Sequence, residues 1–263
     1  MKAFRDRVAV VTGAASGIGA ALCAELGRAG ALVIATDVDG DGAARVAAAI
    51  PHARGERVDV TDAAAVDAFA ASLGRIDVWI NNAGIGVGGA TLDLERADWD
   101  RVLAVNLDGV IHGVRAAYPR MVSQGSGQII NIASVSGIAP YPFALPYVTT
   151  KHAVVGLSLA LRAEARGLGV KVNVACPGMI DTPIWQRSAV RGELAKLRTD
   201  VLLRLASRTT AQTCAEKILR GAAANRAVTT VTAEARLMWM LTRLSPDLAT
   251  WVGHRIATAV RAR

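Results

Sequence analysis

Apolar residues in the first part of the chain alternate between short β-branched runs and segments with helical spacing. The runs at residues 8–11, 31–36, 55–60 and 76–80 predict buried strands. The segments between them, at 20–29, 43–50 and 62–73, predict helices. Repeated strand-helix units favour a parallel sheet with right-handed crossovers, and such sheets bind ligands at the carboxyl ends of their strands.

The second part of the chain continues this alternation with longer helices. A helix is expected over 99–121, a strand over 128–133, a long helix from Tyr147, a strand over 170–176, a helix over 211–223 and a short strand over 227–231. Residues 184–206 also show helical spacing and carry several arginines. That segment fits a mobile flap over a site and an ordinary surface helix equally well.

The last segment, residues 233–263, has leucines and tryptophan at helical spacing together with five arginines. A basic amphipathic helix is compatible with peripheral contact at a membrane surface. Packing against a neighbouring subunit or over a substrate pocket is the favoured interpretation. No linker or repeat divides the chain, so we expect one domain over 1–263 with an amphipathic helical tail.

Composition narrows the classes of function. The chain has 263 residues, of which 52% are hydrophobic and 20% charged, which excludes a disordered protein. The formal net charge is +8, but the basic residues are scattered, so no nucleic-acid partner is expected. The sequence contains no run of eighteen apolar residues and no leader pattern, and three cysteines without a C-x-x-C pair fit a reducing cytoplasm. Four histidines without metal-site spacing predict no metal site.

A glycine-rich loop follows the first predicted strand. Residues 12–19 read T-G-A-A-S-G-I-G and run directly into a helix. Glycines allow close approach of the backbone to a ligand, and the free N–H groups at a helix start bind a diphosphate. The spacing is G-x-x-x-G-x-G, which differs from the commoner G-x-G-x-x-G. The strand-loop-helix context still predicts a dinucleotide site.

Asp37 ends the second predicted strand, eighteen residues after Gly19. A carboxylate at this point accepts hydrogen bonds from both hydroxyls of an adenosine ribose and repels a 2′-phosphate. No basic residue stands at Ala15, Ser16 or Val38 to offset that repulsion. We therefore expect NAD to be preferred over NADP, although Asp37 also begins a turn-forming run of Asp and Gly.

The stretch from Ser134 to Lys151 joins a strand end, a proline-rich loop and a helix start. Tyr147 and Lys151 are four residues apart, so a helix places them on the same face. A nearby ammonium favours a phenolate, and we expect it to lower the pKa of Tyr147. Ser134 contributes a hydroxyl at the strand end. The pattern alone is also compatible with an incidental helix pair.

In order and spacing, these motifs resemble the short-chain dehydrogenase/reductase family. The resemblance rests on the glycine loop from Thr12 to Gly19, the Asn-Asn-Ala-Gly run at 81–84, Asn106, Ser134, the Tyr147-x-x-x-Lys151 pair and Pro177-Gly178. It extends from about residue 7 to residue 182. It implies a single Rossmann-type, doubly wound α/β domain with a seven-stranded parallel sheet flanked by helices.

The same resemblance implies roles for individual residues. The catalytic residues are expected to be Tyr147 as acid/base, Lys151 as its stabiliser and ribose ligand, Ser134 as the substrate hydrogen-bond donor, and Asn106 as the holder of a relay water. The expected cofactor-binding residues are Thr12, Gly13, Ser16, Gly17, Ile18, Gly19, Asp37, Asp59, Val60, Asn82, Ala83, Gly84, Tyr147, Lys151, Pro177, Gly178, Ile180 and Thr182.

The predicted function is hydride transfer between NAD(H) and a secondary alcohol or ketone of an apolar small molecule, such as a steroid-like, terpenoid or fatty compound. Ser136, Tyr141, Phe143 and Trp185 are expected to line the substrate pocket, because such pockets are mostly apolar. A non-catalytic dinucleotide sensor or scaffold and an NADP-dependent 3-oxoacyl-type reductase remain alternatives. Apolar surface on the helices at 99–121 and from Tyr147 predicts a homodimer or homotetramer.

Overall fold

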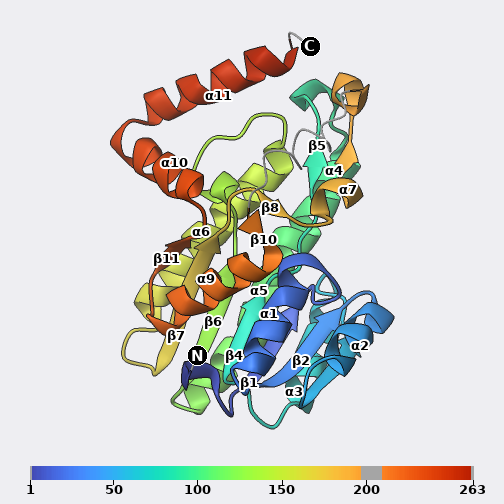
Figure 1. Ribbon diagram of the computed structural model, residues 1–263, viewed down its shortest axis with the longest axis vertical. Coiled ribbons are helices and arrows are strands. Elements are labelled where there is room, and N and C mark those ends of the chain that lie inside the picture. Colours follow the sequence, from blue (N-terminus) through green and yellow to red (C-terminus); the bar gives the residue numbers. More distant parts are fainter. Residues whose placement is uncertain (1, 197–208, 262–263) are drawn as a thin grey trace.

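Seven parallel strands form the centre of the structure, a computed structural model that describes residues 2–196 and 209–261 (Figure 1). The strands are β1 (Val8–Thr12), β2 (Leu32–Asp37), β3 (Ala53–Arg57), β4 (Val78–Asn81), β6 (Gly127–Ile132), β7 (Val170–Cys176) and β11 (Val228–Thr230). Their order in the sheet is β11-β7-β6-β4-β1-β2-β3. The chain reverses its direction of winding between β1 and β4, which is where open α/β sheets bind ligands.

Helices cover both faces of this sheet (Figure 1). On one face lie α1 (Gly17–Arg28), α2 (Gly40–Ala48) and α9 (Ala211–Ala223); on the other lie α3 (Ala63–Ser72), α5 (Gly109–Ser123) and α6 (Leu145–Glu164). Strand residues alternate between the two layers: Ala9 and Val11 pack in the first core, and Val10 packs in the second. The expected seven-stranded, doubly wound fold is confirmed.

A chain of buried polar side chains crosses the sheet beneath the second layer. Trp79 Nε1 donates to Asn81 Oδ1 at 2.8 Å, Asn81 Nδ2 donates to Asn131 Oδ1 at 2.8 Å, and Asn131 Nδ2 donates to the Ser158 hydroxyl at 2.9 Å. Ser158 in turn donates to the Val154 carbonyl. Each group has a partner, so the network joins β4, β6 and α6 without leaving a buried donor unpaired.

The helix predicted over 99–121 is longer and interrupted. It comprises α4 (Arg96–Leu103), one π turn (Ala104–Asp108) and α5. The fully buried amide of Asn106 in this turn pairs with the backbone of Ile85, donating to its carbonyl at 2.9 Å and accepting from its N–H at 2.8 Å. Single π turns recur at functional sites. Helical periodicity cannot reveal this insertion, because the pairing is with a distant loop.

The helical pattern over 184–206 does not form one surface helix within 184–196. The structure has a four-residue helix α7 (Ile184–Arg187), a short strand β9 (Ala189–Val190) and a 3₁₀ segment (Gly192–Lys196). Gly192 has φ +60, and β9 pairs with β5 (Val87–Gly88), which a continuing helix would not allow. The rest of this segment, 197–206, lies outside the described residues. β8 (Ile180–Asp181) pairs with β10 (Thr209–Thr210) just before α9.

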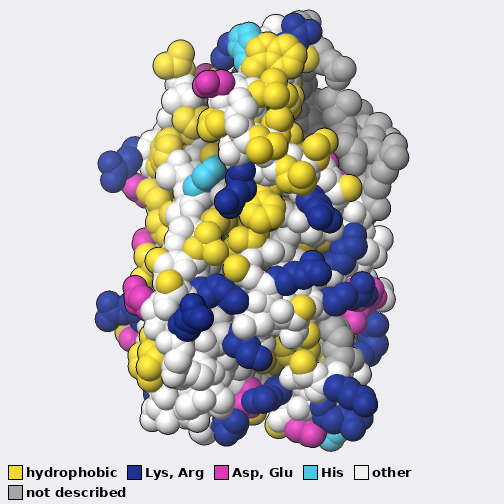
Figure 2. Space-filling view, turned by 90° about the vertical axis from the view of Figure 1, so that its left-hand side faces the viewer, with side chains coloured by type: hydrophobic (Ala, Val, Ile, Leu, Met, Phe, Trp, Pro, Cys, Tyr) yellow, Lys and Arg dark blue, Asp and Glu magenta, His cyan; other side chains and the backbone are white. Residues whose placement is uncertain are grey.

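The C-terminal tail forms two helices, α10 (Ala233–Leu244) and α11 (Pro246–Arg261), at one end of the molecule (Figure 1). Ala235 packs with Val135 and Ala139 of the loop after β6, so the tail covers that loop. Its outward side exposes Leu237, Met240, Leu244, Leu248 and Trp251. Figure 2 shows apolar side chains gathered on the upper part of this side of the molecule among Lys and Arg. Within the described part of the chain, no helix is long and apolar enough to cross a membrane.

Candidate active site

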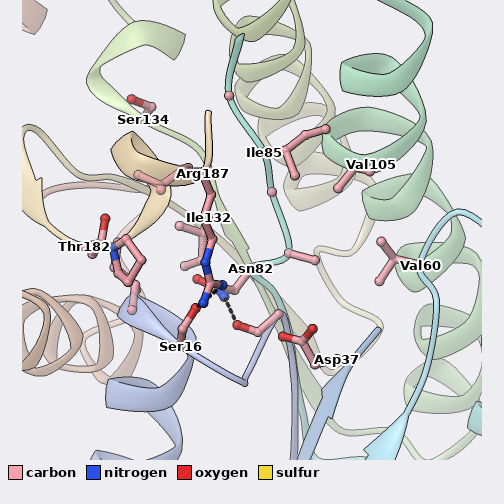
Figure 3. Close-up of a pocket in the computed structure, with 18 of the residues that line it drawn as sticks. Ser16, Asp37, Val60, Asn82, Ile85, Val105, Ile132, Ser134, Thr182 and Arg187 are labelled. Carbon is pink, nitrogen blue, oxygen red and sulfur yellow. Dashed lines mark hydrogen bonds between the residues drawn. The ribbon is translucent and has the colours of Figure 1, made fainter. Parts of the chain in front are cut away.

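A cavity of about 440 Å³ opens at the carboxyl ends of the strands. It is lined by the loop after β1, the ends of β2, β4, β6 and β7, the start of α6, and α7 (Figure 3). Of the expected site residues, the lining includes Gly13, Ser16, Gly17, Ile18, Asp37, Asp59, Val60, Asn82, Ala83, Gly84, Ser134, Tyr147, Lys151, Pro177, Gly178, Ile180 and Thr182. Residues far apart in the sequence therefore meet in one place.

The glycine loop is shaped by backbone geometry and close packing. Gly13 and Gly17 have φ +65 and +57, a region that residues with a side chain rarely adopt. Gly19 does not line the cavity; a Cβ there would lie 2.1 Å from the Gly13 carbonyl oxygen. Gly19 therefore brings the start of α1 against the loop, while Gly13 and Gly17 turn the backbone toward the cavity.

The start of α1 presents unpaired donors to this cavity. Its N-cap, Ser16, makes no side-chain capping hydrogen bond, and the first turn contains no acidic residue. The first N–H groups of a helix lack intrahelical partners, and the helix dipole adds positive potential there. This end of the cavity is therefore suited to an anion.

Carboxylates stand at another part of the cavity. Asp37 Oδ2 accepts from the Ala15 N–H at 2.9 Å, and Oδ1 accepts from the Asp39 N–H at 3.0 Å. These bonds fix the carboxylate beside the glycine loop, and each oxygen keeps a lone pair for a further donor. Asp59 is held in a turn, where Oδ1 accepts from the N–H and hydroxyl of Thr61.

Thr12 and Asn82 lock the loop after β1 to the loop after β4. The Thr12 hydroxyl accepts from the N–H groups of Asn82 and Ala83 at 3.0 and 3.1 Å. Asn82 Nδ2 donates to the carbonyls of Thr12 and Gly13 at 2.9 and 3.1 Å. Thr12 does not line the cavity, so its observed contacts shape the two loops that do.

Ser134, Tyr147 and Lys151 meet at the end of β6 and the start of α6. Tyr147 and Ser134 both line the cavity, and the Ser134 hydroxyl acts to lower the pKa of the Tyr147 phenol. Lys151 is 3% exposed; its Nζ donates to the Ile132 carbonyl at 2.9 Å and lies 5.5 Å from the centre of the Tyr147 ring. The helix spacing therefore places the phenol and the ammonium side by side, as the sequence predicts.

The expected lowering of the phenol pKa is wrong, because the net shift is upward. Burial raises the pKa of Tyr147, and the Ser134 hydroxyl opposes this only in part. Burial also lowers the pKa of Lys151 to about 8. The physical reason is that removal from water disfavours the charged form of both groups, and the ammonium faces the ring and a carbonyl.

Asn106 lies next to the cavity but is not among the described residues that line it. Asn106 sits behind Gly84, where a Cβ would lie 3.4 Å from Asn106 Oδ1 and 3.6 Å from Lys151 Nζ. Its side-chain oxygen and nitrogen already bind Ile85, so a water-holding role through that amide stays a prediction.

Three of the four expected substrate residues, Ser136, Tyr141 and Phe143, are not among the described residues that line this cavity. Tyr141 faces Met179 and Glu234, and burial, followed by the Glu234 charge, raises its pKa. Phe143 stacks with Arg261 of α11, at 5.7 Å. Ser136 is buried and donates its N–H to Ser134. Trp185 lies in α7, and its side chain is outside the part that the structure describes; the substrate role of all four stays a prediction.

Several lining residues were missed from the sequence. Ile85, Gly86 and Val105 line the cavity beside the Asn-Asn-Ala-Gly run, and Ile184 and Arg187 reach it from α7. Ile85 and Gly86 directly follow the Asn-Asn-Ala-Gly run at 81–84, so their position in the sequence could have predicted them. Arg187 carried no such signal, because its approach to the glycine loop depends on the path of the chain after β8.

The donor set fits a nicotinamide dinucleotide. The unpaired N–H groups at the start of α1 suit a diphosphate, the Asp37 carboxylate suits ribose hydroxyls, and the cavity continues to Tyr147 and Lys151. The sequence model of the family described as short chain dehydrogenase matches residues 7–191. The chain belongs to the short-chain dehydrogenase/reductase family.

Relatives within this family differ in length and named activity. The probable oxidoreductase EphD of Mycobacterium tuberculosis (strain ATCC 25618 / H37Rv) is 43% identical over 190 residues, 69% of this chain and 32% of EphD. The chain thus spans about a third of the length of this relative. D-threitol dehydrogenase of Mycolicibacterium smegmatis is 38% identical over 200 residues, which are 72% of this chain and 77% of that protein.

Solved structures of similar proteins share the whole fold. A short-chain dehydrogenase/reductase from Burkholderia phymatum in complex with NAD has a TM-score of 0.85 and 31% identity, covering 94% of this chain and 96% of its own. A short-chain dehydrogenase from Sphingobium yanoikuyae in complex with NADPH has a TM-score of 0.79 and 26% identity, covering 90% and 92%. Similar folds thus bind either dinucleotide.

Proposed function

We propose that the protein is an NAD(H)-dependent oxidoreductase that interconverts a secondary alcohol and a ketone. The observation that carries this proposal is the convergence of Ser134, Tyr147 and Lys151 in the same cavity as the glycine loop and Asp37. A sensor or scaffold would need the dinucleotide end alone. The acid/base end of the cavity favours catalysis over that alternative.

In the oxidation direction the alcohol loses a hydride from its carbon and a proton from its hydroxyl. A bound nicotinamide dinucleotide supplies the hydride acceptor. Tyr147, as phenolate, takes the proton, and Ser134 donates a hydrogen bond to the substrate oxygen. Lys151 stabilises the phenolate and holds the nicotinamide ribose. Since burial raises the pKa of Tyr147, the phenolate needs the neighbouring Lys151 ammonium to offset that burial, and the positive charge of an oxidised nicotinamide would act in the same direction.

NAD is the preferred cofactor in this proposal. A carboxylate at Asp37 next to the ribose hydroxyls repels a 2′-phosphate. The discriminating measurement is the ratio of kcat/KM with NAD and NADP in wild type and in Asp37→Ala. A fall in that ratio for the variant supports the role of Asp37. A wild type that prefers NADP contradicts it and favours the 3-oxoacyl-type reductase alternative.

The proposed substrate is an apolar small molecule. Ile85, Val105 and Ile184 line the cavity, and Tyr141 and Phe143 lie in the loop between β6 and α6. A panel of steroid-like, terpenoid and fatty alcohols with NAD, followed by NADH absorbance, tests this class. The panel includes D-threitol, because a relative bears that name. Turnover of polyols without turnover of apolar alcohols would overturn this part of the proposal.

We further propose that the protein acts as a homodimer or homotetramer in the cytoplasm. Leu159 on α6 is 41% exposed, and Cys23, Cys176 and Cys214 are buried and free, as suits a reducing compartment. Light scattering of wild type and Leu159→Glu at micromolar concentration tests the assembly. A wild-type monomer would contradict it.

A further inference from the structure

Arg187 reaches the dinucleotide cavity from a segment that no sequence motif connects with it. It is the last residue of α7, and its Nη1 donates to the Ser16 hydroxyl at 3.2 Å across 171 positions of sequence. Figure 3 shows its side chain extending from α7 down to Ser16, between Thr182 and Asn82. The guanidinium therefore lies directly over the start of α1.

Arg187 differs in charge from the other residues at its end of the cavity. Among the described lining residues, the basic side chains are Lys151 and Arg187, and the acidic ones are Asp37 and Asp59. Lys151 is bound to the Ile132 carbonyl at the Tyr147 end. Arg187 is thus the cation at the glycine-loop end, beside unpaired N–H groups and a positive helix terminus.

The segment that carries Arg187 is held by strand pairing both before and after it. Before it, β8 pairs with β10. After it, β9 pairs with β5, and the Arg191 guanidinium binds both oxygens of Asp98, from Nε to Oδ2 at 3.0 Å and from Nη2 to Oδ1 at 2.8 Å. Asp98 is 1% exposed, and hydrogen bonds from Arg191 help to lower its pKa. The residues between these two anchors, 182–188, form a strap that contributes Thr182, Pro183, Ile184 and Arg187 to the cavity wall.

We propose that Arg187 is a cofactor-binding residue that closes this strap over the dinucleotide diphosphate. The guanidinium exchanges the Ser16 hydroxyl for diphosphate oxygens, which form stronger, charge-assisted hydrogen bonds with it. The diphosphate then receives backbone N–H groups from α1 on one side and Arg187 on the other. This inference rests on the proposed dinucleotide-dependent function.

The diphosphate is favoured over an adenosine 2′-phosphate as the anion. Ser16 is the N-cap of α1, whose free N–H groups form the anion site. A 2′-phosphate would be placed near the ribose hydroxyls and hence near the Asp37 carboxylate, which repels it. Because NAD and NADP share the diphosphate, Arg187 should contribute equally to the binding of both.

The test compares Arg187→Gln with wild type in the binding of NADH, NADPH, ADP-ribose and adenosine, followed by NADH fluorescence and its displacement. Hydrogen bonds to a charged group contribute enough to predict a loss of about tenfold to hundredfold in the affinity of the three diphosphate ligands. The affinity for adenosine stays unchanged. Arg187→Lys keeps the charge and recovers part of the loss. The matched control, Arg243→Gln on α10, removes an arginine stacked on Trp239 and leaves every affinity unchanged.

The outcomes distinguish failure of the Arg187 proposal from failure of the proposed function. A loss confined to NADPH would assign Arg187 to the 2′-phosphate, and equal loss for adenosine would assign it to the adenosine end; either result overturns the proposal. Unchanged affinity for all four ligands in Arg187→Gln also overturns it, while the proposed function stands. Failure of wild type to bind NADH, NADPH and ADP-ribose would overturn the proposed function itself.

Discussion

Gly19 is the position where the packing of α1 against the glycine loop is most easily perturbed. In Gly19→Ala the new methyl would lie 2.1 Å from the Gly13 carbonyl oxygen and 2.6 Å from Asn82 Nδ2, where real Cβ contacts are not shorter than 3.0 Å. The first neighbour is backbone, so no side chain can swing away. The start of α1 and the loop must separate by nearly 1 Å at this point.

Two magnitudes follow from this displacement. Overpacking of a tight site costs about 1–3 kcal/mol of unfolding free energy, which corresponds to a fall in Tm of roughly 2–12 °C for a chain of this size. Displacing the first N–H groups of α1 weakens hydrogen bonds to the charged diphosphate, each worth about 1.5–3 kcal/mol, so the Kd for NADH should rise at least about tenfold. Fluorescence titration gives the Kd, and thermal unfolding monitored by circular dichroism gives the Tm.

Ala20→Gly is the matched control for this experiment. It also destabilises α1, by about 1 kcal/mol, because glycine is a poor helix former. Ala20 is next to Gly19 but does not line the cavity. The Kd of the Ala20→Gly variant for NADH should therefore equal that of wild type. If Gly19→Ala binds NADH as tightly as Ala20→Gly does, the close contact between α1 and the loop does not set the cofactor site, and the reasoning is refuted.

Three further predictions concern buried polar groups. Burial acts to raise the pKa of Asp77, but hydrogen bonds, foremost from Arg75, lower it overall; Asp77→Asn should lose about 1–3 kcal/mol at pH 7. In urea unfolding, the difference in unfolding free energy between wild type and Asp77→Asn should shrink as the pH falls below about 4. Protonation of Asp77 then removes the stabilisation that its carboxylate gains from these hydrogen bonds. Lys151 has a pKa of about 8. Keeping this buried ammonium charged in the folded protein therefore lowers the unfolding free energy of wild type by about 3 kcal/mol at neutral pH. The unfolding free energy of wild type relative to Lys151→Met should rise as the pH increases from 8 toward 10.5; a constant difference would contradict this. Ser158→Ala leaves Asn131 Nδ2 unpaired and should lower the unfolding free energy by about 1–3 kcal/mol without changing the NADH Kd.

The strand ends and the motifs that follow them could be predicted from the sequence because both depend on local pattern. β-branched runs set the buried strands, and parallel winding brings their carboxyl ends to one edge. The glycine loop, Asp37, Tyr147 and Lys151 therefore fall together without knowledge of any contact.

The features that escaped prediction depend on contacts between distant segments. The π turn at Asn106 is stabilised by Ile85, and the break after α7 by pairing with β5 and by the bond from Arg191 to Asp98. The raised pKa of Tyr147 results from burial, which spacing along a helix does not report. Arg187 reaches Ser16 only because the strap forms part of the cavity wall.

The central claim is that one cavity binds the dinucleotide and that Tyr147 carries the proton at its far end. Tyr147→Phe keeps the ring and its packing and removes only the hydroxyl. The most direct measurement is therefore the Kd for NADH and kcat, on the substrate that the panel identifies, in this variant and in wild type. The account predicts an NADH Kd close to that of wild type and a kcat reduced by about 10²–10⁴-fold. Undiminished kcat in Tyr147→Phe would contradict it.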